Sequence, residues 1–485
     1  MASYTPLTAP VPTKDLPKGI PYIITNEAAE RFSFYGMKSI LIIFMTKYML
    51  DANGAEDFMS ADEAKANYHL FTTAVYFTPI FGALLADWFL GKYKTILILS
   101  IVYCLGHFAL AMDETRMGLA VGLGLIALGS GGIKPCVSAH VGDQFGKTNG
   151  SLLEKVFGWF YFSINLGAFL STLLTPWLLA NYGPHVAFGV PGALMALATI
   201  FFWMGRKVFV HIPPGGKEFV REAFSREGLA SIGRLGIIYA FVAMFWALFD
   251  QTGSAWVLQA DHELMDRNFM GIEWLPSQIQ SINPIMIMVF IPIFNGVKAI
   301  GWPGLYPLMN RVWNLTPLRK IGLGFFITVP AFLIPAWIEA QLAAGITVNI
   351  VWQLFAYLVL TAAEVLVSIT CLEFSYTQAP KRMKSLILAC FLMSVAMGNA
   401  FVAGVNFFIQ NPDGSSKLAG AEYYNFFALC MLVTAVIFIP VAMAYKEKTY
   451  LQDESGSEGN DDGDAPPPPP AKKTLLDAET IVDEA

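Results

Sequence analysis

Charged side chains line one face of a segment that is otherwise apolar. Residues 22–50 carry this set at helical spacing: Glu27, Glu30, Arg31, Tyr35 and Lys38. On a helix of 3.6 residues per turn they form one continuous stripe. Two acids and two bases on one face neutralise each other only in part. The stripe is therefore a candidate for proton exchange and for binding a charged ligand.

Other apolar runs contain further polar or ionisable residues, namely His69, Tyr76, Lys134, Asn165, Asp250, Asn283 and Glu364. An ionisable residue inside a membrane costs about 2.5 kcal/mol or more, so it should face the protein interior and find a partner. A purely structural explanation is that such charges reach the membrane surface or form ion pairs between helices. That explanation fits Lys134 and Glu364 poorly, because each lies deep in its run without an opposite charge on its own segment.

The charges also separate along the chain. Arg31, Lys38 and Lys134 lie in the first half, whereas Asp250 and Glu364 lie in the second. Such a distribution suits ion pairs between the halves, or a ligand with one anionic and one cationic end. Glu27, Glu30 and His69 are then candidate proton carriers, because histidine titrates near neutral pH without help.

The amino-acid composition indicates that these residues lie in a membrane protein. Hydrophobic residues make up 55% of the 485-residue chain and charged residues only 14%, which excludes disordered, collagen-like, disulfide-stapled and nucleic-acid-binding proteins. Apolar runs long enough to cross a membrane recur along the chain. We expect an all-α membrane protein with twelve transmembrane helices at 22–50, 66–90, 94–112, 118–141, 152–181, 187–210, 231–259, 277–300, 317–342, 347–371, 383–410 and 421–445.

Lysine and arginine set the expected orientation. They concentrate in every second connection, which places both termini in the cytoplasm. The longest basic connection separates two halves of six helices each. The expected organisation is an N-terminal segment 1–21, a first half 22–210, a linker 211–230 with an amphipathic stretch at 217–226, a second half 231–445, and an acidic, Pro-rich disordered tail 446–485.

Short motifs resemble one known family. The run Glu27–Met37 (EAAERFSFYGM) resembles the ExxERF[ST]xYG signature of the proton-coupled oligopeptide transporters, which belong to the major facilitator superfamily. Phe160–Gly167 resembles that family's FYxxINxG signature, and Gly82–Lys92 resembles the superfamily's loop motif. Three more segments resemble the animal peptide transporters: Gly131–Pro135, Ala247–Gln251 and Glu373–Pro380.

The resemblance implies a major facilitator fold that imports di- and tripeptides together with protons, by alternating access, across the inner (cytoplasmic) membrane. It implies no other cofactor, no metal, no nucleic-acid partner, lipid around the helices and a functional monomer. The substrate-binding residues that it implies are Arg31, Tyr35, Lys38, Tyr76, Lys134, Asn165, Trp256, Asn283 and Glu364. Those implied for proton coupling are Glu27, Glu30, Arg31, His69 and Glu364. The implied gating ion pairs are Lys38–Asp250 and Lys134–Glu364.

Departures and alternatives remain. Lys38 stands where the family usually has arginine, and a lysine lacks the planar fork that binds a carboxylate through two hydrogen bonds. The chain lacks the extra helices and extracellular domain of many relatives, which suggests a bacterial member.

An alternative function is transport of a non-peptide solute, such as an amino acid, nitrate or a drug. A membrane enzyme is disfavoured, because the six histidines are scattered and HExxH and GxSxG motifs are absent from the sequence. A receptor or scaffold that uses the tail is a third alternative.

Overall fold

The computed structural model describes residues 7–146, 148–149, 152–217, 221, 224–297, 300–378, 384–412 and 415–446. The predicted disordered tail lies almost wholly outside the described residues, as does much of the predicted amphipathic stretch 217–226.

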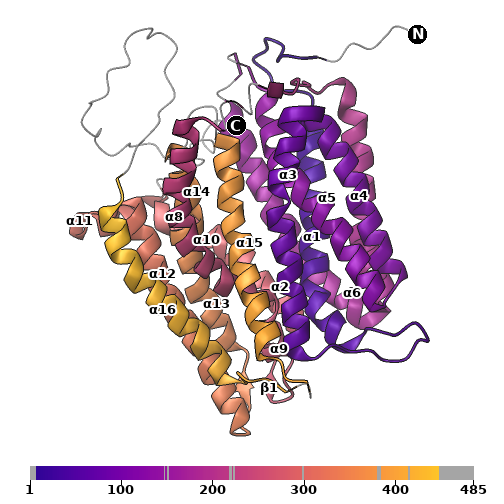
Figure 1. Cartoon of the computed structure of the whole chain (residues 1–485), viewed down its shortest axis with the longest axis vertical. Coiled ribbons are helices and arrows are strands. Elements are labelled where there is room, and N and C mark those ends of the chain that lie inside the picture. Colours follow the sequence, from indigo (N-terminus) through magenta and orange to yellow (C-terminus); the bar gives the residue numbers. More distant parts are fainter. Residues whose placement is uncertain are drawn as a thin grey trace.

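Helices dominate the described chain (Figure 1). The first half contains α1 (Ile20–Lys47), α2 (Ala61–Phe77), α3 (Pro79–Leu84), α4 (Lys92–Met112), α5 (Arg116–Asp143) and α6 (Leu153–Met204). The second half contains α8 (Arg226–Phe249), α9 (Ala255–Ala260), α10 (Ile282–Asn295), α11 (Leu305–Val312), α12 (Pro317–Ala343), α13 (Val351–Glu364), α14 (Thr370–Gln378), α15 (Lys384–Ile409) and α16 (Ala421–Ala444). Short π-helical or 3-10 turns occupy Leu85–Leu90, Gly205–Lys207, Asp250–Gly253, Pro276–Ser281 and Val365–Ile369.

Four short strands and α11 were not predicted from the sequence. The strands are β1 (Met265–Asp266), β2 (Asn268–Phe269), β3 (Ile272–Glu273) and β4 (Val348–Asn349). β1 pairs in parallel with β4, and β2 pairs antiparallel with β3. Two-residue strands are too short to produce a recognisable alternation of apolar and polar residues.

Hydroxyl side chains fix where several helices begin. Ser60, Thr115, Ser225 and Thr316 each accept a hydrogen bond from a backbone N–H three residues later. Such N-caps satisfy one of the backbone donors that a helix start leaves without an intrahelical partner. These residues therefore mark the entries of α2, α5, α8 and α12.

Ten described helical segments are apolar and long enough to cross a membrane. α1 also has the length, with 28 residues, but carries the charged stripe. α6 spans 52 residues and would measure about 78 Å if straight, far more than one crossing needs. It breaks at Gly183, whose φ of 78° is left-handed and which precedes a proline that disfavours helical geometry. With α1 and both parts of α6, the described helices accommodate the twelve predicted crossings.

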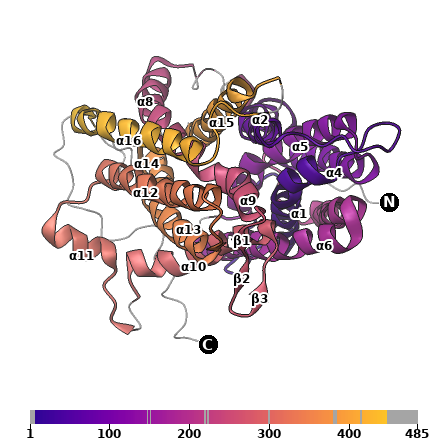
Figure 2. The same ribbon diagram turned by 90° about the horizontal axis from the view of Figure 1, so that it is seen from below.

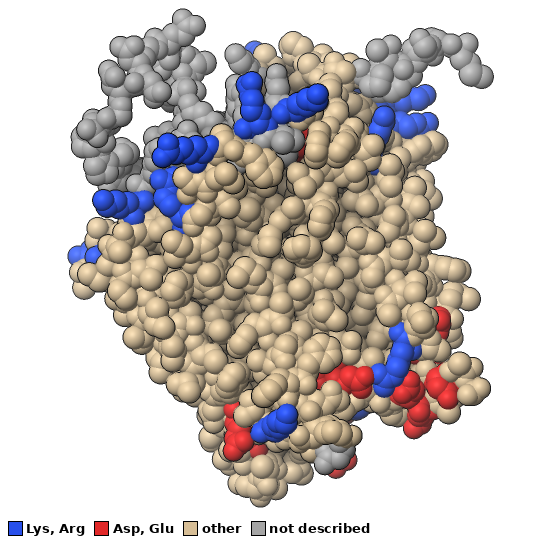
Figure 3. All heavy atoms as spheres, in the orientation of Figure 1, with Lys and Arg blue, Asp and Glu red and all other residues tan. Residues whose placement is uncertain are grey.

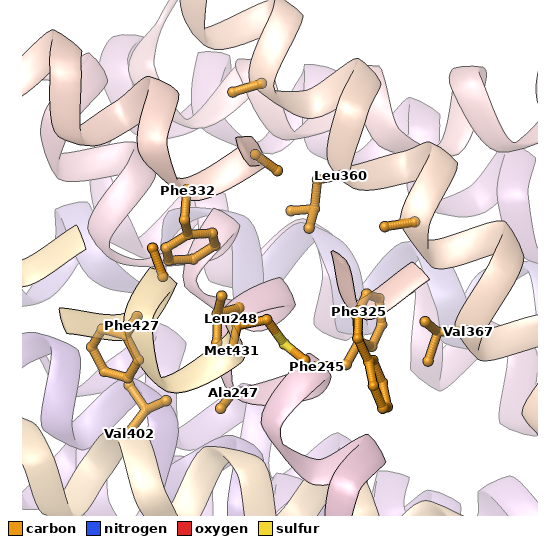
Figure 4. Packing of buried hydrophobic residues seen from close by; sticks show 14 of the residues in the cluster. Phe245, Ala247, Leu248, Phe325, Phe332, Leu360, Val367, Val402, Phe427 and Met431 are labelled. Carbon is orange, nitrogen blue, oxygen red and sulfur yellow. The ribbon is translucent and has the colours of Figure 1, made fainter. Parts of the chain in front are cut away.

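Two large apolar cores, and a third small cluster of Ile287, Phe294, Val365 and Leu366, lie in the described part of the chain. One lies between Ile20 and Phe209 and adds Val257. The other lies between Leu235 and Phe438, and Figure 4 shows Phe245, Phe332 and Met431 among its members. The two halves meet where α15 packs along α2, and Figure 2 shows these helices side by side. The predicted residue boundaries of the halves stay predictions.

On the face that Figure 3 shows, exposed charge lies at the two ends of the molecule. Figure 3 shows a broad band without charged residues, with Lys and Arg above it and mainly Asp and Glu below it. The first described residues of the chain lie at the basic end (Figure 1). Such a band is what a membrane-embedded surface requires, because lipid-exposed charges are costly.

Close packing at Gly82 gives the first prediction. A Cβ at Gly82 would lie 2.0 Å from the carbonyl oxygen of Gly132 on α5. We expect Gly82→Ala to lower the free energy of unfolding by about 1–3 kcal/mol, because backbone atoms must move apart. Gly124 on α5 is exposed and has nothing within 4 Å of an added Cβ, whereas Gly82 lies on α3. Gly124→Ala is the matched control, and unfolding temperatures of the purified variants provide the measurement. Equal unfolding temperatures would contradict the prediction.

Candidate functional site

A buried cluster of charges surrounds Glu30 on α1. Glu27 and Glu30 are both 2% exposed. Arg31 Nε lies 2.7 Å from Glu27 Oε1 and 3.3 Å from Glu30 Oε2. On α5, Lys134 Nζ lies 3.6 Å from Glu30 Oε1, and Ser130 Oγ donates a 2.9 Å hydrogen bond to the same oxygen. Glu30 thus faces two cations at once, and a proton on its carboxyl would weaken both attractions.

The predicted Lys134–Glu364 ion pair is not formed in this structure. Lys134 lies against Glu30 of its own half and 4.0 Å from the ring centroid of Phe34. Glu364, at the end of α13, accepts a 2.7 Å hydrogen bond from Asn283 Nδ2 on α10. Each charge therefore has a partner on a neighbouring helix of its own half. The Lys134–Glu364 pair stays a prediction for another conformation.

Lys38 and Asp250 join the two halves. Lys38 Nζ on α1 donates a 2.9 Å hydrogen bond to Asp250 Oδ1, which follows α8. Both residues are less than 9% exposed. Asn399 Nδ2 on α15 donates a 2.7 Å hydrogen bond to the other Asp250 oxygen. The aspartate is therefore held by one cation from the first half and one amide from the second.

His69 extends this contact between the halves. On α2, its Nδ1 lies 2.6 Å from Asn399 Oδ1 and its Nε2 lies 2.8 Å from Ser254 Oγ. Because Asn399 Nδ2 already donates to Asp250, its oxygen is the acceptor for His69. Nδ1 must then donate, and Nε2 either accepts from or donates to the Ser254 hydroxyl. Lys38, Asp250, Asn399, His69 and Ser254 thus form one buried chain of polar contacts.

Several predicted binding residues meet between the halves. Tyr35 lies within electrostatic reach of Arg31 and Lys38 in the first half and of Glu364 in the second. Tyr76 lies near Tyr35 and Lys38. Cations of the first half and the carboxylate of the second therefore act on the same tyrosine.

Trp256 does not line an accessible space in this structure. It is 0% exposed and packs in the second core, with ring centroids 4.9 Å from Tyr357 and 5.7 Å from Phe332. The sequence placed Trp256 beside the ligand, but its position on the short helix α9 turns the ring into the core. Asn165 is 9% exposed, and its Nδ2 donates a 3.0 Å hydrogen bond to the Tyr161 carbonyl.

Further contacts tie the halves together at the end opposite the N-terminus. Lys47 Nζ donates to Asp261 Oδ1 at 2.7 Å. Lys65 Nζ lies 3.9 Å from the ring centroid of Tyr423. Three glutamines also bridge the halves: Gln278 to the Leu173 carbonyl at 2.9 Å, Gln280 to the Ser39 carbonyl at 3.1 Å, and Gln410 to Ser60 Oγ at 3.1 Å. This end is therefore closed in the structure.

Comparison with known families assigns the chain. The model described as the POT family matches residues 93–234 and 225–426. The chain belongs to the POT family. Within the described part of the chain, no three His, Cys, Asp or Glu residues come together as a group that could hold a metal ion.

Relatives of this POT chain carry transporter names. It is 38% identical to solute carrier family 15 member 2 of Danio rerio over 67% of this chain and 50% of that protein. It is 36% identical to peptide transporter family 1 of Drosophila melanogaster over 69% of this chain and 49% of that protein. The chain spans about half the length of the curated relatives it matches.

Solved POT structures share the fold. The crystal structure of the POT family transporter PepTSo is 36% identical and has a TM-score of 0.79, covering 89% of this chain and 99% of that one. The structure of an auto-inhibited POT family peptide transporter is 33% identical, with a TM-score of 0.78 over 90% of this chain and 99% of that one. The predicted major facilitator fold is thereby confirmed.

The sequence did not identify every residue of this POT site. Asn399, Ser254 and Ser130 contact the predicted charges, yet polar residues are common in apolar runs and nothing in their spacing singles them out. Tyr161 could have been found, because it lies in the FYxxINxG segment. It is 43% exposed and within electrostatic reach of Glu364.

A double-mutant cycle on Lys38 and Asp250 gives the second prediction. We expect Lys38→Met and Asp250→Asn each to lower the free energy of unfolding by about 3 kcal/mol, because one charge stays buried without its partner. The double variant should lose less than the sum, since both charges are gone. Unfolding temperatures provide the measurement.

Lys47→Met is the control for this cycle. The Lys47 side chain is 50% exposed, so its pair with Asp261 should contribute about 1 kcal/mol or less. Additive losses at Lys38 and Asp250 would show that the two residues are not coupled.

Proposed function

We propose that this POT chain is a proton-coupled symporter that imports di- and tripeptides by alternating access. The names of its relatives support this function. The observation that carries it is the position of Glu30, whose carboxylate lies 3.3 Å from Arg31 and 3.6 Å from Lys134. A proton on Glu30 frees two cations for a second anion, which is the linkage that symport requires.

The same site supplies recognition of a peptide's two ends. Arg31, Lys134 and Lys38 attract the terminal carboxylate, and Glu364 attracts the terminal amine. Asn283 orients Glu364 through its 2.7 Å hydrogen bond. Asn165 binds the peptide backbone, while Tyr35 and Tyr76 pack against the side chains. Because only main-chain groups are held by charge, peptides with varied side chains fit.

The contacts between the halves act as gates. Opening the closed end requires the Lys38–Asp250 pair and both His69 contacts to separate. Protonation of His69 changes which of its nitrogens can accept a hydrogen bond, so His69 couples this step to pH. In the opposite conformation Lys134 pairs with Glu364. Glu27 partly neutralises the positive charge of Arg31 through their 2.7 Å ion pair.

The basic end faces the cytoplasm. Lys and Arg gather at the end that carries the N-terminus (Figure 3). Positive residues favour the cytoplasmic side of a membrane protein. Both termini are then cytoplasmic, in a chain that works as a monomer in the inner membrane of a bacterium, and the closed end faces outward.

The proton gradient supplies enough energy for uphill uptake. One pH unit is worth about 1.4 kcal/mol per proton. A membrane potential of about 100 mV adds about 2.3 kcal/mol per charge moved. One proton per peptide therefore supports accumulation of about 500-fold.

A non-peptide solute is the alternative substrate. Glu364 decides between the two classes, since nitrate has no amine for a carboxylate to bind. Excess unlabelled dialanine that fails to compete with a labelled non-peptide solute, together with uptake of that solute, would favour the alternative.

The third prediction tests the substrate class. In proteoliposomes with an inward proton gradient, we expect uptake of labelled dialanine that stops when the gradient is collapsed. Glu364→Gln should reduce dialanine affinity about tenfold or more, because a hydrogen-bonded charge pair with the amine is lost. Glu273→Gln is the control, since its side chain is 78% exposed. Unchanged affinity in Glu364→Gln would remove this residue from the binding site.

The fourth prediction tests the proton role of Glu30. Glu30→Gln should abolish accumulation above equilibrium, because a permanently neutral side chain cannot exchange a proton. Counterflow of dialanine between preloaded vesicles and buffer should persist, since it needs no net proton movement. Uphill uptake at the wild-type rate in Glu30→Gln vesicles would remove Glu30 from the coupling mechanism.

A further inference from the structure

One short turn of the second half makes several of the contacts with the first half. Residues Asp250–Gly253 form a 3-10 turn between α8 and α9. Asp250 accepts the hydrogen bond from Lys38, and the hydroxyl of Ser254, directly after the turn, lies 2.8 Å from His69 Nε2. The proposed function uses both of these contacts as gates. Gly253 lies between Asp250 and Ser254 in the sequence, and the proposed function gives it no role.

Gly253 lies directly against Tyr68 on α2 of the first half. A Cβ added to Gly253 would overlap the Tyr68 hydroxyl oxygen and would lie 2.8 Å from Tyr68 Cζ. Tyr68 is 1% exposed, and Lys38 Nζ lies 5.2 Å from the centroid of its ring. A side chain packed in this way has little room to turn aside. The two halves therefore approach this closely only because residue 253 has no side chain.

This contact differs from the other close approaches that glycines make. Gly82, Gly106 and Gly398 also lack room for a Cβ, but the atoms that a Cβ would meet belong to the same half as the glycine. Among the described glycines, Gly253 is the one whose nearest neighbour belongs to the opposite half. Contacts within a half persist when the halves rock against each other. The contact of Gly253 with Tyr68 exists only while the halves are together at this end.

The turn belongs firmly to the second half, and its backbone does not itself require glycine. The Tyr357 hydroxyl on α13 donates a 3.1 Å hydrogen bond to the Thr252 carbonyl, so the turn moves with the second half. Gly253 is not one of the described glycines with a positive φ, and other residues can adopt its backbone conformation. Space for Tyr68, rather than backbone freedom, is therefore what glycine supplies at this position.

We propose that Gly253 is a positioning residue for transport, which lets the closed end shut by leaving room for Tyr68. This inference rests on the alternating access of the proposed function. A side chain at residue 253 overlaps Tyr68 only when the halves are together, so it destabilises the closed arrangement and leaves the open one unstrained. Over-packing of a tight contact is costly enough to shift the ratio of closed to open molecules by about tenfold.

The test measures the distance between the halves at the closed end by electron–electron resonance of two spin labels. Asn53, in the connection after α1, and Met270, between β2 and β3, are exposed and lie at this end (Figure 1). The labels are attached through Asn53→Cys and Met270→Cys after the five native cysteines are replaced by alanine. In Gly253→Ala, we expect the longer distance to gain about tenfold over the shorter one.

Two further variants make the test specific. Gly404→Ala is the matched control, because Gly404 on α15 has nothing within 4 Å of an added Cβ, and it should keep the wild-type distances. Adding Tyr68→Phe to Gly253→Ala removes the overlapping hydroxyl, so the double variant should regain part of the shorter distance. A general loss of stability would not be rescued in this way.

Uptake kinetics give an independent readout. In Gly253→Ala proteoliposomes, the maximal rate of proton-driven dialanine uptake should fall about tenfold, while KM for external dialanine should not rise, because the site stays open to the outside. Wild-type distances in Gly253→Ala, or an opening or a folding defect that Tyr68→Phe does not relieve, would overturn the inference. A wild type that keeps one distance at every pH and dialanine concentration would instead overturn the proposed alternating access.

Discussion

A carboxylate at membrane depth needs partners that stabilise its charge, and Glu30 is the residue that imposes this condition on the first half. Its two oxygens are shared by Arg31, Lys134 and Ser130. Isolated, any of these charges would cost several kcal/mol in the membrane. Together they form a cluster whose net charge changes with a single proton, which is why it can respond to both pH and an incoming anion.

The second consequence of buried charge is that polar contacts join the halves in addition to the packing of α15 along α2. Lys38, Asp250, Asn399, His69 and Ser254 each depend on the next. Losing one member leaves another without its partner.

Much of the fold and of the charged site could be predicted from the sequence, for identifiable reasons. Helical periodicity placed Glu30, Arg31 and Lys38 on one face, because a repeat of 3.6 residues is visible in a single segment. Partners from distant helices, such as Asn399, could not be found, since their positions depend on how α15 packs against α2. The role of Trp256 beside the ligand stays a prediction, and its burial in the second core depends on tertiary packing that leaves no periodic signal in the sequence. The break at Gly183 in α6 falls between the predicted helices 152–181 and 187–210.

The two separate apolar cores have a consequence for how the protein is assembled. Most buried apolar side chains that pack around α1 precede Val210, and those that pack around α12 follow Ser225. The described residues between His211 and Ser225 belong to neither core. Cutting the backbone there would leave each fragment with a nearly complete interior of its own, so that polar recognition between the fragments could restore the whole molecule.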